Sequence, residues 1–310
     1  MITTVTLNPA IDRSYIINNF KPNNNYRIDD VTVTVGGKGI NVARTVSALG
    51  EKLNATGFLG GITGDYIKKQ LNDLGIATSF VKINDESRNF TAIIDPINRT
   101  ETTVNEVGPF VSKTELTKFI KEYIKILKYS KIIIASGSVP KGVPKTIYRD
   151  MVKIAKDNNV LPIIDASGKF LEEAIKAKPY MIKPNLKELR ELVGYELNNE
   201  YEIIHESKYI CKQGVGLVVI SLGSKGAIFT TREKVIKVEA PNIKAVNTVG
   251  SGDALVAGFA VALVNKFDLD NAFRYGIACG AANALEKGIG NIKKETVERL
   301  FSQVKLTRLE

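Results

Sequence analysis

From residue 112 onward, hydrophobic and polar residues follow a helical pattern and a strand pattern in turn. Apolar residues recur at helical spacing in the segments 113–127, 145–158, 167–174, 186–193 and 200–213. Short apolar runs, typical of strands buried on both faces, separate these segments at 131–135, 161–165, 180–183 and 216–221. The alternation predicts an α/β fold with a doubly wound, mostly parallel sheet flanked by helices.

The rest of the chain adds elements of the same kinds. A β-rich run at residues 2–7 ends at Asn8-Pro9 and is typical of a buried strand that leads into a loop at the sheet edge. Further strands are expected at 53–59, 78–83, 227–230 and 235–238. Further helices are expected at about 36–49, 64–74, 254–264 and 268–286.

Two pairs of short strand-like stretches do not fit the alternation of strand and helix. Residues 14–17 and 30–35 form the first pair, and 90–95 and 101–107, joined by a turn at 96–99, form the second. We therefore expect one domain over residues 1–310 with a small β-lid built from about 13–35 and 88–107. An isolated small sheet leaves an apolar face bare, which predicts a homodimer through the lids.

Composition narrows the classes of protein to consider. The 310 residues, of which 44% are hydrophobic and 25% charged, are typical of a globular protein. No apolar run is long enough to span a membrane, and no basic segment precedes an apolar core at the N-terminus. Cys211 and Cys279 form no C-x-x-C pair, so we expect neither a disulfide nor a zinc site, and a cytoplasmic location.

The distribution of charged residues and the single histidine argue against two functions, nucleic-acid binding and histidine-dependent catalysis. The net charge of +10 comes from lysines scattered over many segments, so we expect no nucleic-acid partner but a surface that attracts anionic substrates. The only histidine, His205, falls in a helix-like segment, which argues against a histidine-dependent catalytic triad.

The stretch 247–259 holds the strongest candidate chemistry. Gly250-Ser251-Gly252 precedes an apolar helical segment, and a helix N-terminus presents unpaired N–H groups to an anion. Asp253 in the first turn is by itself more often a stabilising helix charge. Beside anion-binding amides, however, it is the proton acceptor that transfer of a phosphoryl group to an alcohol needs.

Residues near the N-terminus suggest a site for a phosphorylated sugar. Gly36, Gly37 and Lys38 combine a backbone that a ligand can approach closely with a point charge suited to phosphate, and Asn41 offers a donor and an acceptor to hydroxyls. Asp12 is either a sugar contact or a loose surface residue. Arg27 and Arg88, each more often a surface charge when alone, would with Lys38 give three cations for a substrate phosphate.

Four motifs, which follow one another along the chain in the expected order, resemble those of the ribokinase-like (PfkB-type) carbohydrate kinases. Residues 247–253 are similar to the family pattern D-T-x-G-A/S-G-D, with Asn247 at its first position. Residues 36–44 match G-G-K-G-x-N-x-A-R, residues 183–188 match K-P-N-x-x-E, and residues 8–12 match the N-P-x-x-D opening of the sugar-phosphate branch. The resemblance spans essentially the whole chain and implies ATP-dependent phosphorylation of a sugar phosphate.

The resemblance also implies roles for residues. Asp253 would be the catalytic base, with Gly250, Ser251 and Gly252 as the anion hole. The implied sugar-phosphate contacts are Asp12, Arg27, Gly36, Gly37, Lys38, Asn41, Arg88 and Ser138. The implied ATP contacts are Lys183, Asn185, Ser221, Gly223, Gly226 and Asn283. Glu188 would hold Mg²⁺ through water, although on its residues alone it is an ordinary first-turn helix residue, and Asn283 is equally well explained by packing at the edge of the core.

The exact substrate stays open at this stage. The motifs are shared by kinases of fructose 1-phosphate, which would give fructose 1,6-bisphosphate, and of tagatose 6-phosphate, and we place fructose 1-phosphate first. Asn89-Phe90-Thr91 departs from the Ile-Asn-Val that many 1-phosphofructokinases have after the arginine. A noncatalytic sugar-phosphate sensor is an alternative of another class, disfavoured because Asp253 and Glu188 are retained. No Walker motif and no protein-kinase H-R-D or D-F-G motif occurs.

Overall fold

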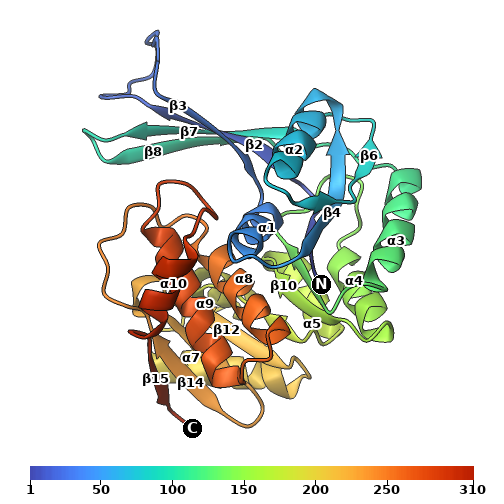
Figure 1. Ribbon diagram of the computed structural model, residues 1–310, viewed down its shortest axis with the longest axis vertical. Helices are drawn as coiled ribbons and strands as arrows, with labels where there is room; N and C mark the ends of the chain where they lie inside the picture. Colours follow the sequence, from blue (N-terminus) through green and yellow to red (C-terminus); the bar gives the residue numbers. More distant parts are fainter.

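Two β-sheets of different size organise the chain, and the computed structural model describes both over all 310 residues (Figure 1). Seven strands of the large sheet run parallel, in the order β5 (Ala77–Thr78), β4 (Leu53–Gly60), β1 (Ile2–Thr6), β9 (Ile132–Ser136), β10 (Leu161–Asp165), β11 (Met181–Ile182) and β12 (Leu217–Ser221). The short β6 (Val81–Ile83) also pairs with β4. Beyond β12 follow the antiparallel β13 (Ala227–Thr230), β14 (Val235–Glu239) and β15 (Lys305–Arg308). The predicted doubly wound, mostly parallel sheet is confirmed.

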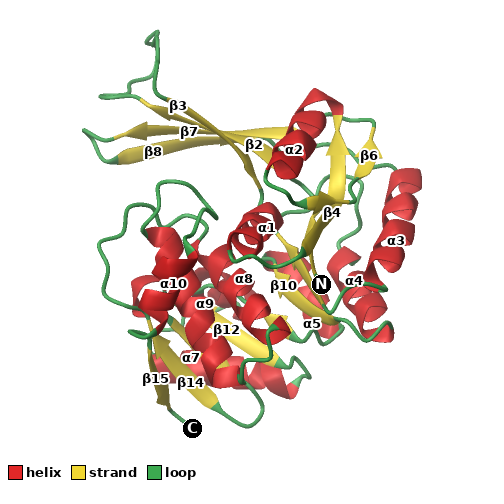
Figure 2. Ribbon diagram, viewed as in Figure 1, coloured by secondary structure: helices red, strands yellow, loops and turns green.

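Helices cover both faces of the large sheet (Figure 2). One core contains side chains of α1 (Lys38–Ala48), α2 (Gly61–Asp73), α8 (Ser251–Val264), α9 (Leu269–Ala284) and α10 (Lys294–Phe301). The opposite core contains side chains of α3 (Lys113–Leu127), α4 (Ile147–Asp157), α5 (Gly168–Lys176), α6 (Leu186–Val193) and α7 (Glu200–Lys212). Because successive side chains of a strand point to opposite faces, Ile132 and Ile134 enter the first core and Ile133 the second. Burial on both faces explains why these strands are apolar runs in the sequence.

The small sheet contains four strands in the order β3 (Val31–Gly36), β2 (Ala10–Ile16), β7 (Arg88–Asp95) and β8 (Thr100–Asn105). It extends from the large sheet over the side where α8 and α10 lie (Figure 1). Its free end is tied together by buried Asp95, whose carboxylate accepts from the backbone N–H groups of Asn19, Phe20 and Ile97. The two strand pairs expected from the sequence therefore form one sheet.

Several local expectations need correction. The expected strand at 78–83 is two short strands, because Ser79 N donates to Ala55 O and the chain then shifts to pair with the far end of β4. Strand β2 begins at Ala10, so Asp12 belongs to the small sheet and not to a loop before it. Helix α10 and strand β15 were not expected at all. No helix in the structure is both long and apolar enough to cross a membrane.

Candidate active site

Polar residues collect at one edge of the large sheet. Ser136 and Asp165 end β9 and β10, Lys183 follows β11, and the N-termini of α1 and α8 lie beside them. Parallel strands end at the same edge, and this edge is where doubly wound folds bind ligands. These residues therefore come together from distant parts of the chain.

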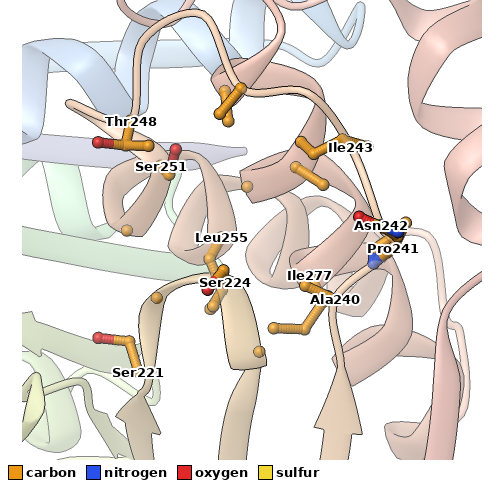
Figure 3. A pocket seen from close by; sticks show the side chains of 17 residues that line it. Ser221, Ser224, Ala240, Pro241, Asn242, Ile243, Thr248, Ser251, Leu255 and Ile277 are labelled. Atoms are coloured by element: carbon orange, nitrogen blue, oxygen red, sulfur yellow. The ribbon is translucent and has the colours of Figure 1, made fainter.

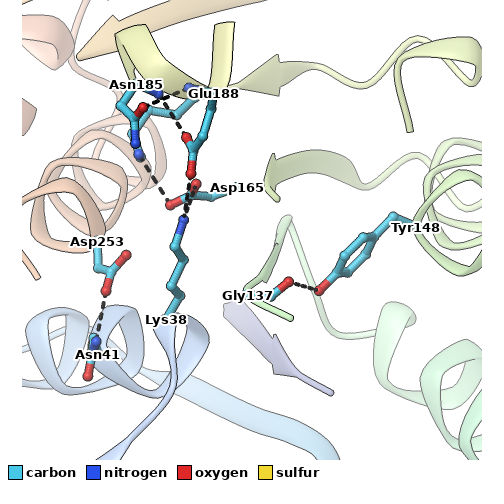
Figure 4. Close-up of polar contacts among 9 residues, drawn as sticks. Lys38, Asn41, Gly137, Tyr148, Asp165, Asn185, Glu188 and Asp253 are labelled. Carbon is cyan, nitrogen blue, oxygen red and sulfur yellow. Dashed lines mark hydrogen bonds and ion pairs between the residues drawn. The ribbon is translucent and has the colours of Figure 1, made fainter. Parts of the chain in front are cut away.

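A buried carboxylate, Asp165, lies at the centre of this edge (Figure 4). Its Oδ1 is 3.1 Å from Lys38 Nζ, and its Oδ2 is 3.3 Å from Lys183 Nζ. Its side chain is fully buried, which alone would favour the neutral acid, but Lys183 and Lys38 hold the pKa of Asp165 below its usual value. The carboxylate is thus charged and fixes two ammonium groups at the site.

Lys38 also reaches the helix that follows β11. Its Nζ lies 3.5 Å from Glu188 Oε1. Burial opposes the charge of this lysine, but the carboxylates of Asp165, Glu188 and Asp253 outweigh burial and raise its pKa. Glu188 Oε2 accepts from Asn185 N while Asn185 Oδ1 accepts from Glu188 N, so these two residues also form a capping box on α6. Glu188 is thus a first-turn helix residue, as its position alone suggested, and its Oε1 remains directed at the site.

Asp253 lies in the first turn of α8 and is only 6% exposed. Asn41 Nδ2, from α1, donates to Asp253 Oδ2 at 2.8 Å (Figure 4). Burial raises the pKa of Asp253 to about 7, the negative charge of Asp165 adds to the rise, and Asn41, Lys38 and Lys183 reduce it. A carboxyl group with a pKa near neutrality is suited to accept a proton and release it again.

The turn before Asp253 has the geometry of an anion hole. Gly250 precedes α8 with a φ of 79°, and a Cβ there would lie 2.3 Å from Ile289 Cγ2, so only glycine fits without displacement. Ser251 N donates to Thr248 O, whereas no backbone carbonyl accepts from the N–H groups of Gly252 and Asp253. Two N–H groups at the positive end of a helix are therefore free for an anion.

Lys183 adds a positive charge to this anion hole. Its Nζ would lie only 3.1 Å from a Cβ placed on Gly252, and its side chain is buried. The ammonium group that Asp165 holds is thus directed at the turn, and an anion bound there would meet both N–H groups and a cation.

Two cavities flank the Asp253 region. One, of about 660 Å³, is lined by Ser221, Gly223, Gly226, Ser251 and Gly252 together with apolar residues of α8, α9 and the 240–245 segment (Figure 3). The other, of about 260 Å³, is lined largely by polar residues, among which are Asn8, Gly37, Lys38, Arg88, Ser138 and Glu188. The first suits a nucleoside with its phosphates, and the second suits a small phosphorylated molecule.

The small sheet contributes Asp12 and Arg88 to the site. The carboxylate of Asp12 makes no hydrogen bond to protein. Burial raises the pKa of Asp12 to about 6, while Arg88 and Arg44 reduce the rise. A Cβ on Gly36 would lie 1.9 Å from Asp12 Oδ2, so the glycine leaves room for this carboxylate. Arg88 Nε donates to Asn8 O at 3.1 Å, which fixes the arginine at the rim of the smaller cavity.

Arg27 is a correction to the expected set of substrate contacts. It is exposed in the 17–30 segment, which joins the ends of β2 and β3 that lie farthest from Asp12 (Figure 1). The strand from Asp12 to Ile16 alone spans about 13 Å. Arg27 is therefore not beside Lys38 and Arg88 in the same chain.

For Asn283 the structure favours the packing alternative over the nucleotide contact. Asn283 is 1% exposed, and its amide is used by the protein: Nδ2 donates to Val249 O and Ser251 Oγ, and Oδ1 accepts from Gly290 N. Asn283 thus braces the anion-hole turn from behind, and its side chain has no free group for a nucleotide.

Some residues of the site were not assigned a role from the sequence. Asp165 received no role beyond its place in the expected strand at 161–165, although an acid at the end of a buried apolar run was a usable signal. Asn8, whose Nδ2 donates to Val107 O and Ser138 Oγ, joins the strand β1 end to two other segments of the smaller cavity. Its position before a proline gave no indication of these partners.

Known proteins resemble this chain over nearly its full length. The sequence model of the family described as pfkB family carbohydrate kinase matches residues 4–296. A tagatose-6-phosphate kinase of Staphylococcus epidermidis is 38% identical, with 99% of each chain covered. The structure of phosphofructokinase-2 from Escherichia coli in complex with potassium has a TM-score of 0.91 at 28% identity, covering 97% of this chain and 98% of that one.

A more distant structure confirms the architecture. Ribokinase from Thermotoga maritima, at 23% identity, gives a TM-score of 0.80 with 97% of this chain and 99% of that chain covered, which shows a shared fold. With the match to the family over residues 4–296, this chain belongs to the pfkB family of carbohydrate kinases and is a sugar-phosphate kinase that uses ATP.

Proposed function

We propose that the protein transfers the γ-phosphoryl group of ATP to the free hydroxymethyl group of a ketohexose phosphate. The observation that carries this proposal is the place of Asp253, whose preceding residues line the larger cavity while its neighbour Lys38 lines the smaller one. A proton acceptor between a nucleotide cavity and a basic cavity is the arrangement that this reaction needs.

One group of site residues binds the sugar phosphate, and another takes part in the chemical step. Lys38, Arg88 and Ser138 bind the phosphate of the sugar, while Asp12 and Asn41 orient its hydroxyl groups. These assignments follow from charge and hydrogen-bonding capacity at the smaller cavity. The same cations favour a substrate that already carries phosphate over an uncharged sugar.

In the chemical step Asp253 accepts the proton of the attacking hydroxyl group. The oxygen forms a bond to the γ-phosphorus, and the bond from this phosphorus to the oxygen that bridges it to the β-phosphate breaks, so that ADP leaves. Negative charge on the transferring group is stabilised by the free N–H groups of Gly252 and Asp253 and by Lys183.

The donor set fits a metal ion that arrives with the nucleotide. No cluster of three or more acidic, histidine or cysteine side chains exists that could hold a metal by itself, and Glu188 has one oxygen outside its helix cap. Mg²⁺ keeps most of its waters and takes few protein carboxylates. We therefore propose Glu188 as its protein contact through water, where the ion would neutralise charge on the ATP phosphates.

Two ketohexose phosphates are candidate substrates, and both fit the site because they carry the same groups at their two ends. Fructose 1-phosphate and tagatose 6-phosphate each have a phosphate at one end and a hydroxymethyl group at the other, and each gives a 1,6-bisphosphate. The sequence motifs placed fructose 1-phosphate first. The full-length similarity to a tagatose-6-phosphate kinase favours tagatose 6-phosphate, and we now place this substrate first.

A coupled assay of ADP release tests the proposal. We expect turnover with tagatose 6-phosphate to exceed that with fructose 1-phosphate and fructose 6-phosphate, judged by kcat/KM. A higher kcat/KM for fructose 1-phosphate would reverse the order of the two candidates. Binding of all three sugars without ADP release would indicate a sensor in place of a catalyst.

Substitution of Asp253 tests the base. Asp253→Asn keeps the shape and the hydrogen bond partner Asn41 but removes the proton acceptor, so kcat should fall by about 10² to 10⁴ while ATP affinity stays nearly unchanged. Steady-state kinetics and equilibrium binding of ATP measure the two quantities. A near-normal kcat would exclude Asp253 as the base.

The pH dependence of the reaction follows from the same group. Because burial raises the pKa of Asp253 to about 7, the carboxyl group is largely protonated at lower pH and cannot accept a proton. With sugar phosphate saturating, kcat/KM for ATP should rise through about pH 7 and level off above it. A profile that stays flat from about pH 6 to pH 8 contradicts this assignment.

We also propose that the small sheet is the lid of a single domain and joins two copies into a homodimer. The strand register places Val33 and Val104 in one row and Val31 in the next, on the face opposite Asp12, and these side chains are 38%, 61% and 39% exposed. Such a face is expected to be covered.

Sedimentation of the unaltered protein should show a dimer. The double substitution Val33→Lys with Val104→Lys should dissociate this dimer, because it places charges in the apolar contact. A monomeric unaltered protein excludes this interface.

A further inference from the structure

The loop that follows β9 forms one wall of the smaller cavity. Gly137 and Ser138 line this cavity together with Lys38, and a Cβ placed on Gly137 would lie 3.7 Å from Lys38 Cβ. Gly137 has a φ of 95°, in the left-handed region that favours glycine. The backbone of this loop, and not only the side chain of Ser138, is therefore available to a ligand in the cavity.

The peptide group that precedes Gly137 is fixed by the large sheet. Gly137 N donates to Asp165 O, at the end of β10, at 3.0 Å. The next peptide group, between Gly137 and Ser138, has no such bond to the sheet, and no protein group accepts from Ser138 N. Because glycine has no Cβ to hinder rotation, the orientation of this second peptide group depends on the groups that bind it.

Tyr148 binds this second peptide group from the core. Its hydroxyl group donates to Gly137 O at 3.0 Å, and no other protein group donates to this carbonyl (Figure 4). Tyr148 lies in α4, is fully buried, and packs edge to face against Phe170, with 6.3 Å between the ring centroids. Burial, together with the charge of Asp165, raises the pKa of Tyr148, so the hydroxyl group keeps its proton and remains a donor.

Peptide planarity converts this bond into a direction for Ser138 N–H. The chain contains no cis peptide bond, and in a planar trans peptide group the C=O and the N–H point in opposite directions. Gly137 O points toward Tyr148, so Ser138 N–H points away from the core, to the side on which Lys38 lies (Figure 4). A free main-chain donor is thus directed at the smaller cavity, on the side of the lysine.

We propose that Tyr148 is a positioning residue, which orients the peptide group between Gly137 and Ser138 so that Ser138 N–H binds the phosphate of the ketohexose phosphate. The proposal rests on the proposed function. Tyr148 touches neither substrate and acts through the peptide group. Because the phosphate of the sugar lies at the end opposite the attacking hydroxyl group, this N–H should bind the substrate and its transition state equally well.

Kinetics of Tyr148→Phe test this role. The substitution removes only the hydroxyl oxygen and leaves Gly137 O without a donor, so the peptide group is free to turn. KM for tagatose 6-phosphate should rise by about threefold to thirtyfold, the effect of one lost hydrogen bond, while kcat and KM for ATP stay nearly unchanged. An unchanged KM for the sugar phosphate overturns the proposal.

Tyr123→Phe is the matched control. Tyr123 is fully buried in the same core, and its hydroxyl group donates to Met151 O at 3.1 Å; neither residue lines the smaller cavity. Both variants lose one buried hydroxyl group and its bond to a main-chain carbonyl, so both thermal midpoints should fall to a similar extent. Only Tyr148→Phe should raise KM for the sugar phosphate. An equal rise in both variants means general loosening of the core and overturns the positioning role.

The amide signal of Ser138 tests the same inference without turnover. In protein with isotopically labelled serine, the signal is assigned by its loss in Ser138→Ala. Tagatose 6-phosphate should move the Ser138 amide proton downfield in the unaltered protein, as a hydrogen bond to an anion does, and should move it less in Tyr148→Phe. A Ser138 signal that stays in place while the sugar phosphate binds contradicts the proposed contact.

The outcomes separate this inference from the proposed function. Failure of the unaltered protein to release ADP with any of the three sugar phosphates overturns the proposed function, while a Ser138 amide that moves on binding still supports the phosphate contact. Normal turnover with an unmoved Ser138 amide overturns this inference alone.

Discussion

The active site depends on one buried negative charge. Asp165 is fully buried between two lysines that come from opposite sides of the site, one from the start of α1 and one from the end of β11. Isolated burial of a carboxylate is costly, and here two ammonium groups offset that cost. The arrangement fixes where the cations stand before any substrate is bound.

The same charge also sets the chemistry of its neighbour. Asp253 lies close enough to Asp165 to be repelled by it, and with burial this repulsion brings its pKa to about 7. Two carboxylates in one site thus take different states, because Asp165 has two cationic partners and Asp253 has chiefly the amide of Asn41. Unequal partners allow one acid to remain a fixed anion and the other to exchange protons.

Much of the fold could be predicted because it depends on local patterns. Helices α3 and α6 and strand β10 coincide with their expected ranges, since apolar periodicity and capping signals determine them within the segment. Strand β15 and helix α10 were missed. β15 is mostly exposed and pairs with β14 at the edge of the sheet, and α10 buries only Val297 and Leu300. Their stability comes from distant contacts that no short window contains.

The candidate site was also predictable only where it depends on local sequence. The motifs pointed to Asp253, Lys38 and the glycines because those residues lie within short stretches whose residue types and spacing indicate their chemistry. Arg27 was misplaced because three cations near a proposed site do not reveal which end of a strand each one occupies. For Asn283 the sequence left nucleotide contact and packing open, because a buried amide and a ligand contact look the same in a sequence, and the structure favours packing. The role of Asp165 depends on two lysines 127 and 18 residues away along the chain.

The short link between β1 and β2 has a mechanical consequence. Only residues 7–9 separate β1, an interior strand of the large sheet, from β2, the strand that carries Asp12. In the proposed function, Asp12 and Arg88 on the small sheet and Lys38, Asn41 and Asp253 on helices α1 and α8 share the contacts to the sugar. Because β3 is also joined to α1 through Gly37 alone, the small sheet can turn only together with both links, and in the proposed function such a turn would change the grip on the sugar and the access of water at the same time.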